Sequence, residues 1–336
     1  MSLLAGGATT AGRPLQPDLP LAAMPSRQPP KRWRSGQQEL FRRDYRTTAA
    51  VPSQPIGSSQ PMPAVLMKPR QKVRGFTYRG AVLNEALLPQ LRAHVRAQEP
   101  LLSAPAVTSS WLCSVCRGPT GRHCVRCYGC DLHMQCAPGS LADVVVPVAF
   151  AIKGGSHARC LWQYKSQRLT AEAVGSAALT VRALLLVFLH DHGPCLWRAA
   201  DIPGPTHLAV VPTARGRPGT HPLRALIAEH LTGPWAELRA RPGGEQVRDL
   251  DPGRFTARAI PGARVLLIDD TWTTGSSAQS AAMALRRAGA DAVVTVVLGR
   301  HVGRAEAERA GLDPAVMPFR LESCPVHAAN PVGLGP

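Results

Sequence analysis

From residue 143 onward, short apolar runs alternate with longer stretches that have helical spacing. Four of these runs are rich in Val, Leu, Ile and Ala and predict buried β-strands, over 143–152, 207–212, 263–270 and 291–299. Ala- and Leu-rich segments between them predict helices, over 171–189, 220–231 and 276–290. Strands that are apolar on both faces and alternate with helices are typical of a parallel sheet covered on both sides. We therefore expect an α/β domain over 139–325.

The first third of the chain follows neither pattern. Residues 1–75 are rich in proline and poor in spaced apolar residues, so we expect them to be disordered. Residues 76–110 read as a linker with one helix over 81–98, which Pro89 would break unless the helix begins there. The last residues, 326–336, read as a flexible tail.

Positive charge is concentrated in the same part of the chain. The whole sequence carries a net +17, and residues 1–110 hold 15 Lys and Arg against 5 Asp and Glu. Such a segment attracts single-stranded DNA or another polyanion without specifying it. A solubilising tail explains the same charge equally well.

No apolar run reaches the length of a transmembrane helix, which needs about 20 residues. The longest lies around Ala183–Leu189 and is flanked by Arg182 and His190. The first residues have no basic lead followed by an apolar core, so they do not read as a signal peptide. We expect a cytoplasmic protein without a membrane partner.

Six of the nine cysteines fall between residues 113 and 136, which favours metal ligation over disulfides in a chain without an export signal. Two CxxC pairs supply four thiolates for a structural zinc ion in a small ribbon over 111–138, and the preferred set is Cys113, Cys116, Cys127 and Cys130. Cys124 is the alternate ligand, and His123, His133 and Cys136 are weaker substitutes. A redox pair or free buried thiols are the competing interpretations. The isolated Cys160, Cys195 and Cys324 read as buried thiols.

Two carboxylates and a hydroxyl-rich loop follow the strand predicted at 263–270. Asp269 and Asp270 stand at its carboxyl end, where open α/β sheets bind ligands. The next residues, Thr273, Thr274, Gly275, Ser276 and Ser277, open a helix whose free N–H groups suit a phosphate. Carboxylates for a sugar diol and donors for a phosphate together fit a phosphorylated ribose. The plainer interpretation is a capped turn between strand and helix.

The chain resembles the ComF-like members of the type I phosphoribosyltransferases, which join a zinc ribbon to a domain that binds phosphoribosyl pyrophosphate (PRPP). Three stretches carry the likeness: the cysteine block, the segment 210–231, and the segment 264–300 with its acid pair and hydroxyl loop. The resemblance implies that Asp269 and Asp270 contact the ribose hydroxyls and act in catalysis. It also implies a PRPP-binding set of Thr271, Thr273, Thr274, Gly275, Ser276 and Ser277, with the 5′-phosphate at 273–277.

The family's basic loop, which faces pyrophosphate, falls on Arg215 and Arg217. This chain lacks the Asn-Gln pair that usually follows that loop. Arg254 would lie on a flexible loop over the site, and Trp272 reads as an exposed or packed loop aromatic more than as a substrate stack. The resemblance implies Mg²⁺ with PRPP, a nitrogen acceptor, release of pyrophosphate and a homodimer. The alternative function is a weakly catalytic or non-catalytic PRPP-binding accessory protein that handles DNA in natural competence.

Overall fold

The computed structural model describes residues 85–104, 111–121, 124–213, 220–241, 249–312 and 317–329. All of them belong to one compact unit, Gln71–Pro336. The segment predicted to be disordered, 1–75, lies outside the described residues, as do the basic-loop residues Arg215 and Arg217 and the weaker ligand candidate His123.

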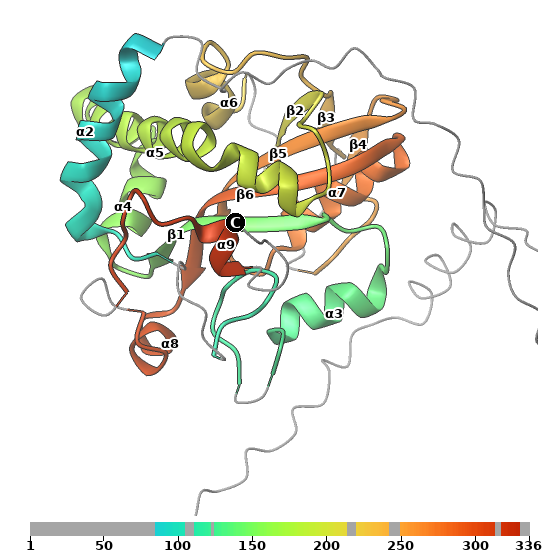
Figure 1. Cartoon of the computed structure of the whole chain (residues 1–336), viewed down its shortest axis with the longest axis horizontal. Helices are drawn as coiled ribbons and strands as arrows, with labels where there is room; N and C mark the ends of the chain where they lie inside the picture. Colours follow the sequence, from blue (N-terminus) through green and yellow to red (C-terminus); the bar gives the residue numbers. More distant parts are fainter. Residues whose placement is uncertain are drawn as a thin grey trace, which may run out of the picture. The chain divides into compact units, whose positions relative to one another are not determined.

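A four-stranded sheet with the order β1-β6-β5-β2 forms the centre of the unit (Figure 1). Its strands are β1 (Val144–Ile152), β2 (His207–Val210), β5 (Ala263–Trp272) and β6 (Ala290–Val302), and every neighbouring pair runs parallel. Parallel strands bring their carboxyl ends to one edge of the sheet. The parallel α/β fold class predicted from the sequence is thus confirmed.

Strand β1 contains a proline because it is an edge strand of this sheet. Pro147 has no N–H to donate, and it lies opposite Val297 of β6, the neighbour of β1 in the sheet. Further along the strand, Phe150 N–H donates to Ser103 O at 2.7 Å, outside the sheet. The segment around Ser103 thereby covers part of the exposed edge.

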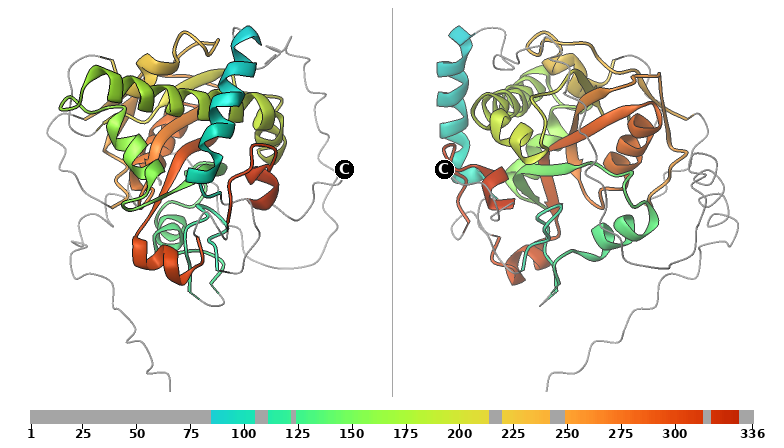
Figure 2. Two further views of the ribbon diagram at one scale, coloured as in Figure 1. Left: turned by 90° about the vertical axis from the view of Figure 1, so that its left-hand side faces the viewer. Right: turned by 45° about the vertical axis from the view of Figure 1, so that its right-hand side comes forward.

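Helices cover both faces of the sheet (Figure 2). One face packs against α2 (Leu88–Gln98), α4 (Ser156–Gln163) and α5 (Ala171–Ala199), and its core contains Ile268 and Val296. The other face packs against α7 (Ser276–Arg287), and its core also includes sulfurs of the cysteine block. The alternation of side chains along β5 and β6 separates these two cores.

Several elements depart from the sequence prediction in length. Helix α5 has 29 residues and continues through Pro194, because its apolar face stays packed in the core beyond 189. Helix α6 (Pro222–Ile227) is shorter than predicted, whereas β5 and β6 are longer because their pairing continues to Trp272 and Arg300. Helix α2 begins at Leu88 with Pro89 in its first turn, which removes the expected conflict.

Short elements with weak apolar patterns were not predicted. They are the helices α3 (Tyr128–Cys136), α8 (Arg304–Arg309) and α9 (Pro325–Ala329), the 3-10 turns Glu85–Leu87 and Glu99–Leu101, and the antiparallel pair β3 (Leu238–Ala240) and β4 (Phe255–Ala257). Helix α4 was not predicted either.

Helix α5 is, among the described residues, the one helix that is long and apolar enough to cross a membrane. Half of its most apolar window is buried inside the protein, and Leu185, Leu186 and Leu189 are fully buried. These contacts assign α5 as the core helix of this fold.

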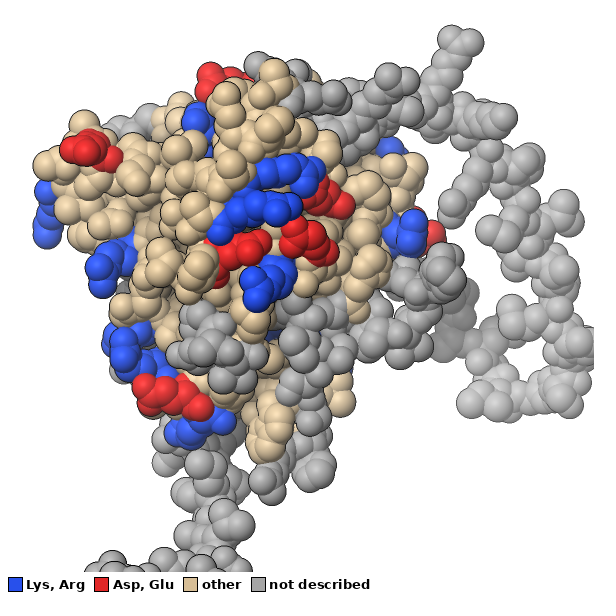
Figure 3. Space-filling view, turned by 60° about the vertical axis from the view of Figure 1, so that its left-hand side comes forward, with Lys and Arg blue, Asp and Glu red and all other residues tan. Residues whose placement is uncertain are grey.

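The surface over α2 carries both signs of charge instead of one positive patch. Figure 3 shows this side of the molecule, with Lys and Arg lying next to Asp and Glu. Arg92 pairs with Asp191 of α5, and Arg96 pairs with Glu322. The described part of this face therefore offers no uniformly basic surface for a polyanion.

Candidate functional site

A cavity of about 700 Å³ lies at the carboxyl ends of β2 and β5. Its size is within the range of roughly 300–1,000 Å³ that is typical of small-molecule sites. The lining comes from four segments: the loop after α4, the end of β2, the start of α6 and the end of β5 with the start of α7. The lining residues are Trp162, Lys165, Ser166, Gln167, Arg168, Val211, Pro212, Thr213, His221, Pro222, Asp269, Asp270, Thr271 and Ser277.

Asp270 is held by two donors from the end of α4. Its Oδ2 accepts from Tyr164 Oη at 2.5 Å and from Lys165 Nζ at 2.5 Å. Burial raises the pKa of Asp270, but the attraction to Lys165 and the two hydrogen bonds outweigh it, so the pKa lies below its usual value. Asp270 is therefore a carboxylate at neutral pH, with one oxygen committed to the protein.

Asp269 has the opposite electrostatic environment. Burial, followed by repulsion from the Asp270 carboxylate, raises the pKa of Asp269 to about 8. Its Oδ1 accepts from the backbone N–H of Asp270 at 2.9 Å, which fixes the side chain. Two adjacent carboxyl groups with pKa values pushed apart are a common feature of functional sites.

The hydroxyl loop turns from β5 into α7 through Gly275. Gly275 has φ +83°, a left-handed conformation that favours glycine, and it caps the helix. Thr274 Oγ1 contacts Ser276 Oγ at 3.0 Å, and Ser277 lines the cavity. The side chains of Thr273 and Thr274 are exposed. The loop thus places several hydroxyl groups at the N-terminus of a 12-residue helix.

Trp272 lies under this loop and not in the cavity. It is 1% exposed, and a Cβ added at Gly275 would meet the indole ring at 2.0 Å. Of the exposed and packed positions that the sequence left open for Trp272, the structure shows the packed one. It also explains the glycine, because any larger residue would collide with the ring.

Arg254 is placed beside the start of α7. Its Nη1 donates to Ser277 Oγ at 2.9 Å and its Nη2 donates to Asp249 O at 2.9 Å. The residue is buried, so it forms part of the wall behind the helix N-terminus. A cation beside the positive end of a helix dipole favours an anion at the same place.

Sequence reasoning missed two charged residues of the cavity wall and one hydrogen-bond partner of the acid pair. Lys165 and Arg168 bring positive charge from the loop after α4, and Tyr164 fixes Asp270. They lie about 100 positions before the acid pair, so no local motif joins them to it. The run of polar and basic residues that directly follows α4 is the one local signal that could have indicated them.

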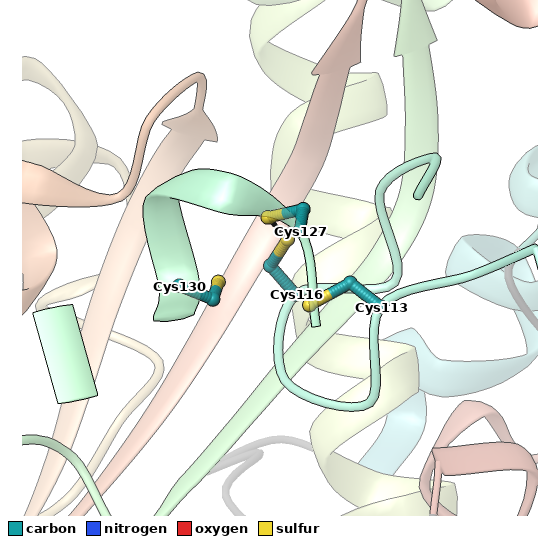
Figure 4. A group of neighbouring side chains, drawn as sticks. All are labelled: Cys113, Cys116, Cys127 and Cys130. Carbon is teal, nitrogen blue, oxygen red and sulfur yellow. Dashed lines mark hydrogen bonds between the residues drawn. The ribbon is translucent and has the colours of Figure 1, made fainter. Parts of the chain in front are cut away.

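The four preferred cysteines gather in a second, separate cluster. The sulfurs of Cys113, Cys116, Cys127 and Cys130 all lie within 4.8 Å of one another, and Figure 4 shows them turned toward a common point. Cys124 is exposed and lies outside the cluster. Neither Cys136 nor the buried His133 belongs to it. Four cysteine thiolates are a donor set that fits a tetrahedrally coordinated metal ion such as zinc.

The module that holds the cysteines differs from the expected ribbon. Cys113 and Cys116 lie on a tight turn that is closed by the bridge between Leu112 and Pro119. Cys127 caps helix α3, and Cys130 lies in its first turn. Within the described part of the module, the first pair therefore lies on a turn and the second pair lies at the start of a helix.

Two buried arginines balance the charge of the sulfur cluster. Arg117 is 4% exposed and Arg300 is 9% exposed. Burial lowers the pKa of Arg300, but the neighbouring Cys116 sulfur raises it above its usual value. Four thiolates around a divalent ion carry a net charge of about −2, which two buried guanidinium groups neutralise.

Arg300 also connects the cluster to the hydroxyl loop. Its Nε donates to Cys116 Sγ at 3.3 Å, and its Nη1 donates to Trp272 O at 3.2 Å and to Thr273 O at 2.9 Å. Gly118 makes room for this contact, because a Cβ there would lie 2.2 Å from the guanidinium. In a trans peptide the C=O and N–H groups point in opposite directions. Because Arg300 binds the carbonyls of Trp272 and Thr273, the N–H groups of those two peptides point away from Arg300 and the sulfur cluster.

Comparison with known proteins assigns neither a family nor an activity to the chain. No family model matches the chain, and no curated protein matches it. Among solved structures, the crystal structure of orotate phosphoribosyltransferase from Aeropyrum pernix aligns with 43% of this chain and 82% of its own, at 20% identity and a TM-score of 0.26. At this TM-score the likeness carries no inference about activity.

Proposed function

We propose that the chain binds PRPP in the cavity at the ends of β2 and β5, and that it is a phosphoribosyltransferase. The observation that carries the proposal is the composition of the cavity wall. The acid pair, the hydroxyl residues Thr271 and Ser277, and two cationic side chains line one volume, and Ser277 lies in the first turn of α7. A ribose that bears anionic groups at both ends requires this combination.

In this proposal each group has one task. Asp269 and the second oxygen of Asp270 accept hydrogen bonds from the ribose 2′- and 3′-hydroxyls. The hydroxyls and N–H groups at 273–277, at the positive end of α7, bind the 5′-phosphate. Arg168 and Lys165, which pairs with Asp270, would face the pyrophosphate from the loop after α4. The basic-loop residues Arg215 and Arg217 remain predicted pyrophosphate contacts.

The reaction would exchange one bond at C1 of the ribose. The C1–O bond to pyrophosphate breaks, the nitrogen of the acceptor forms a bond to C1, and the acceptor nitrogen loses its proton. The Asp270 carboxylate beside the ring would stabilise the positive charge that develops on the sugar, and the cations would stabilise the leaving group. The carboxylate oxygens fit Mg²⁺, which would neutralise the pyrophosphate when bound.

A second candidate function is a PRPP-binding protein with little or no turnover. The departure after Arg217, where the family's Asn-Gln pair is absent, favours it. Both functions require PRPP to bind, and pyrophosphate release separates them.

Binding is tested with PRPP and Mg²⁺ in thermal-shift and calorimetric titrations. We expect stabilisation of the wild-type protein, loss of binding in Asp270→Asn and retention in Asp291→Asn. Asp291 is an exposed aspartate at the start of β6 and provides the same chemical change away from the cavity. Absence of any PRPP binding, or equal binding by both variants, would refute the proposal. A screen of nitrogen acceptors for pyrophosphate release then assigns the enzyme or the accessory function.

A further inference from the structure

A third group of metal-type ligands lies apart from both sites described above. His192 and Cys195 are on α5, and Cys324 immediately precedes α9. One donor atom from each of the three residues lies within 4.8 Å of those of the other two. His192 is 8% exposed, and both cysteines are half-buried. The fold thus brings together three residues that read as unrelated in the sequence.

The histidine is oriented as a metal-bound histidine usually is. His192 Nε2 lies 3.2 Å from Leu321 O, a backbone acceptor, so we assign the ring proton to Nε2. The assignment leaves Nδ1 with its lone pair, and the ring interacts with the Cys324 thiol. Metal-ligating histidines typically donate their second ring nitrogen to a backbone carbonyl or a carboxylate, which fixes the ring.

The spacing of the donors completes the pattern. His192 and Cys195 form an H-x-x-C pair, and Cys324 and His327 form a C-x-x-H pair. The His327 side chain is exposed and lies within one helical turn of Cys324, although it is outside the group of three donors.

We propose that His192, Cys195 and Cys324 bind a second divalent ion of the zinc class, and that His327 supplies the fourth ligand. Two thiolates and two imidazoles are a common structural zinc set. The ion would tie the segment before α9 to the core helix α5. It is independent of PRPP binding and of the Cys113 cluster, because it shares no residue with either.

Metal content of the full-length protein, purified under reducing conditions in the presence of zinc, tests this site. We expect two zinc ions per wild-type chain, one in Cys195→Ser, one in Cys324→Ser, and two in Cys160→Ser. Cys160 is a half-buried cysteine outside both clusters and is the matched control. Where Cys195→Ser does not fold, Cys324→Ala removes a ligand from a short terminal segment instead.

The zinc content of the wild-type protein and the absorption spectrum of the cobalt-substituted protein decide whether the second site exists. One zinc ion per wild-type chain, lost on Cys113→Ser, would overturn the second site, and so would a Cys195–Cys324 disulfide found by mass spectrometry. With cobalt in place of zinc, the wild-type minus Cys324→Ser spectrum should show a tetrahedral site with thiolate charge transfer. His327→Ala should keep the second ion but weaken its affinity by about tenfold or more. An unchanged affinity would reject His327 as the fourth ligand.

Discussion

Replacing Gly275 with alanine tests how the loop between β5 and α7 is held. The residue has φ +83°, which costs an alanine about 1–2 kcal/mol. The new Cβ would also lie 2.0 Å from Trp272 Cζ2 and 2.2 Å from its Cε2. Trp272 is 1% exposed, so the ring cannot move into solvent, and overpacking of this kind costs about 1–3 kcal/mol. Gly275→Ala should therefore lower the free energy of unfolding by about 2–5 kcal/mol.

Gly175→Ala provides the control with the opposite sign. Gly175 is exposed within α5, and an added Cβ meets nothing within 4 Å. The same substitution there should raise the free energy of unfolding by about 0.5–1 kcal/mol, because alanine favours the helix. Urea denaturation monitored by circular dichroism measures both variants. If Gly275→Ala lay within about 1 kcal/mol of the wild-type protein, the geometry assigned to the loop and to Trp272 would be wrong.

Three further predictions concern the acid pair and the sulfur cluster. The pKa of Asp269 is raised from 3.8 to about 8, so the folded state holds this proton longer than the unfolded state, and the group's contribution to stability is lost as pH rises from about 4 to 8. Asp269→Asn should remove that loss, and urea midpoints from pH 5 to 9 with the same slope in both proteins would contradict it. Lys165→Met removes the cation beside Asp270 and should weaken PRPP binding by more than about tenfold, measured by calorimetry against the exposed-pair variant Arg96→Met. Arg300→Lys keeps the charge but cannot reach Cys116 and the carbonyls of Trp272 and Thr273 together, so zinc affinity in chelator competition and PRPP affinity should both fall; a change in only one would show that Arg300 does not link the two sites.

The sequence predicts those parts of the site that depend on neighbouring residues. The CxxC spacing identified Cys113, Cys116, Cys127 and Cys130, because ligands three residues apart can share one ion whatever the surrounding fold. The apolar run before Asp269 likewise located the acid pair at the end of a strand. Both features depend on residues close together in the sequence, and the tertiary contacts of the fold did not change them.

Features that depend on contacts between distant segments were not predictable in this way. Tyr164 and Lys165 reach Asp270 across more than 100 residues, through the packing of α4 on the sheet. Cys195 and Cys324 read as separate buried thiols, since only the docking of the segment before α9 on α5 brings them together. The length of β5 was underestimated because polar residues at its end normally mark a loop, whereas pairing of Thr271 with Gly299 continues the strand.

The sulfur cluster and the loop between β5 and α7 both depend on the side chain of Arg300, which contacts Cys116 and the carbonyls of Trp272 and Thr273. If the ion leaves the sulfur cluster, or if the sulfurs are oxidised, the negative charge that keeps the guanidinium in the interior disappears. The carbonyls of Trp272 and Thr273 would then lose their donor at the same moment, without any change in the residues that line the cavity. A metal that never meets the substrate would in this way decide whether the substrate has a place to bind.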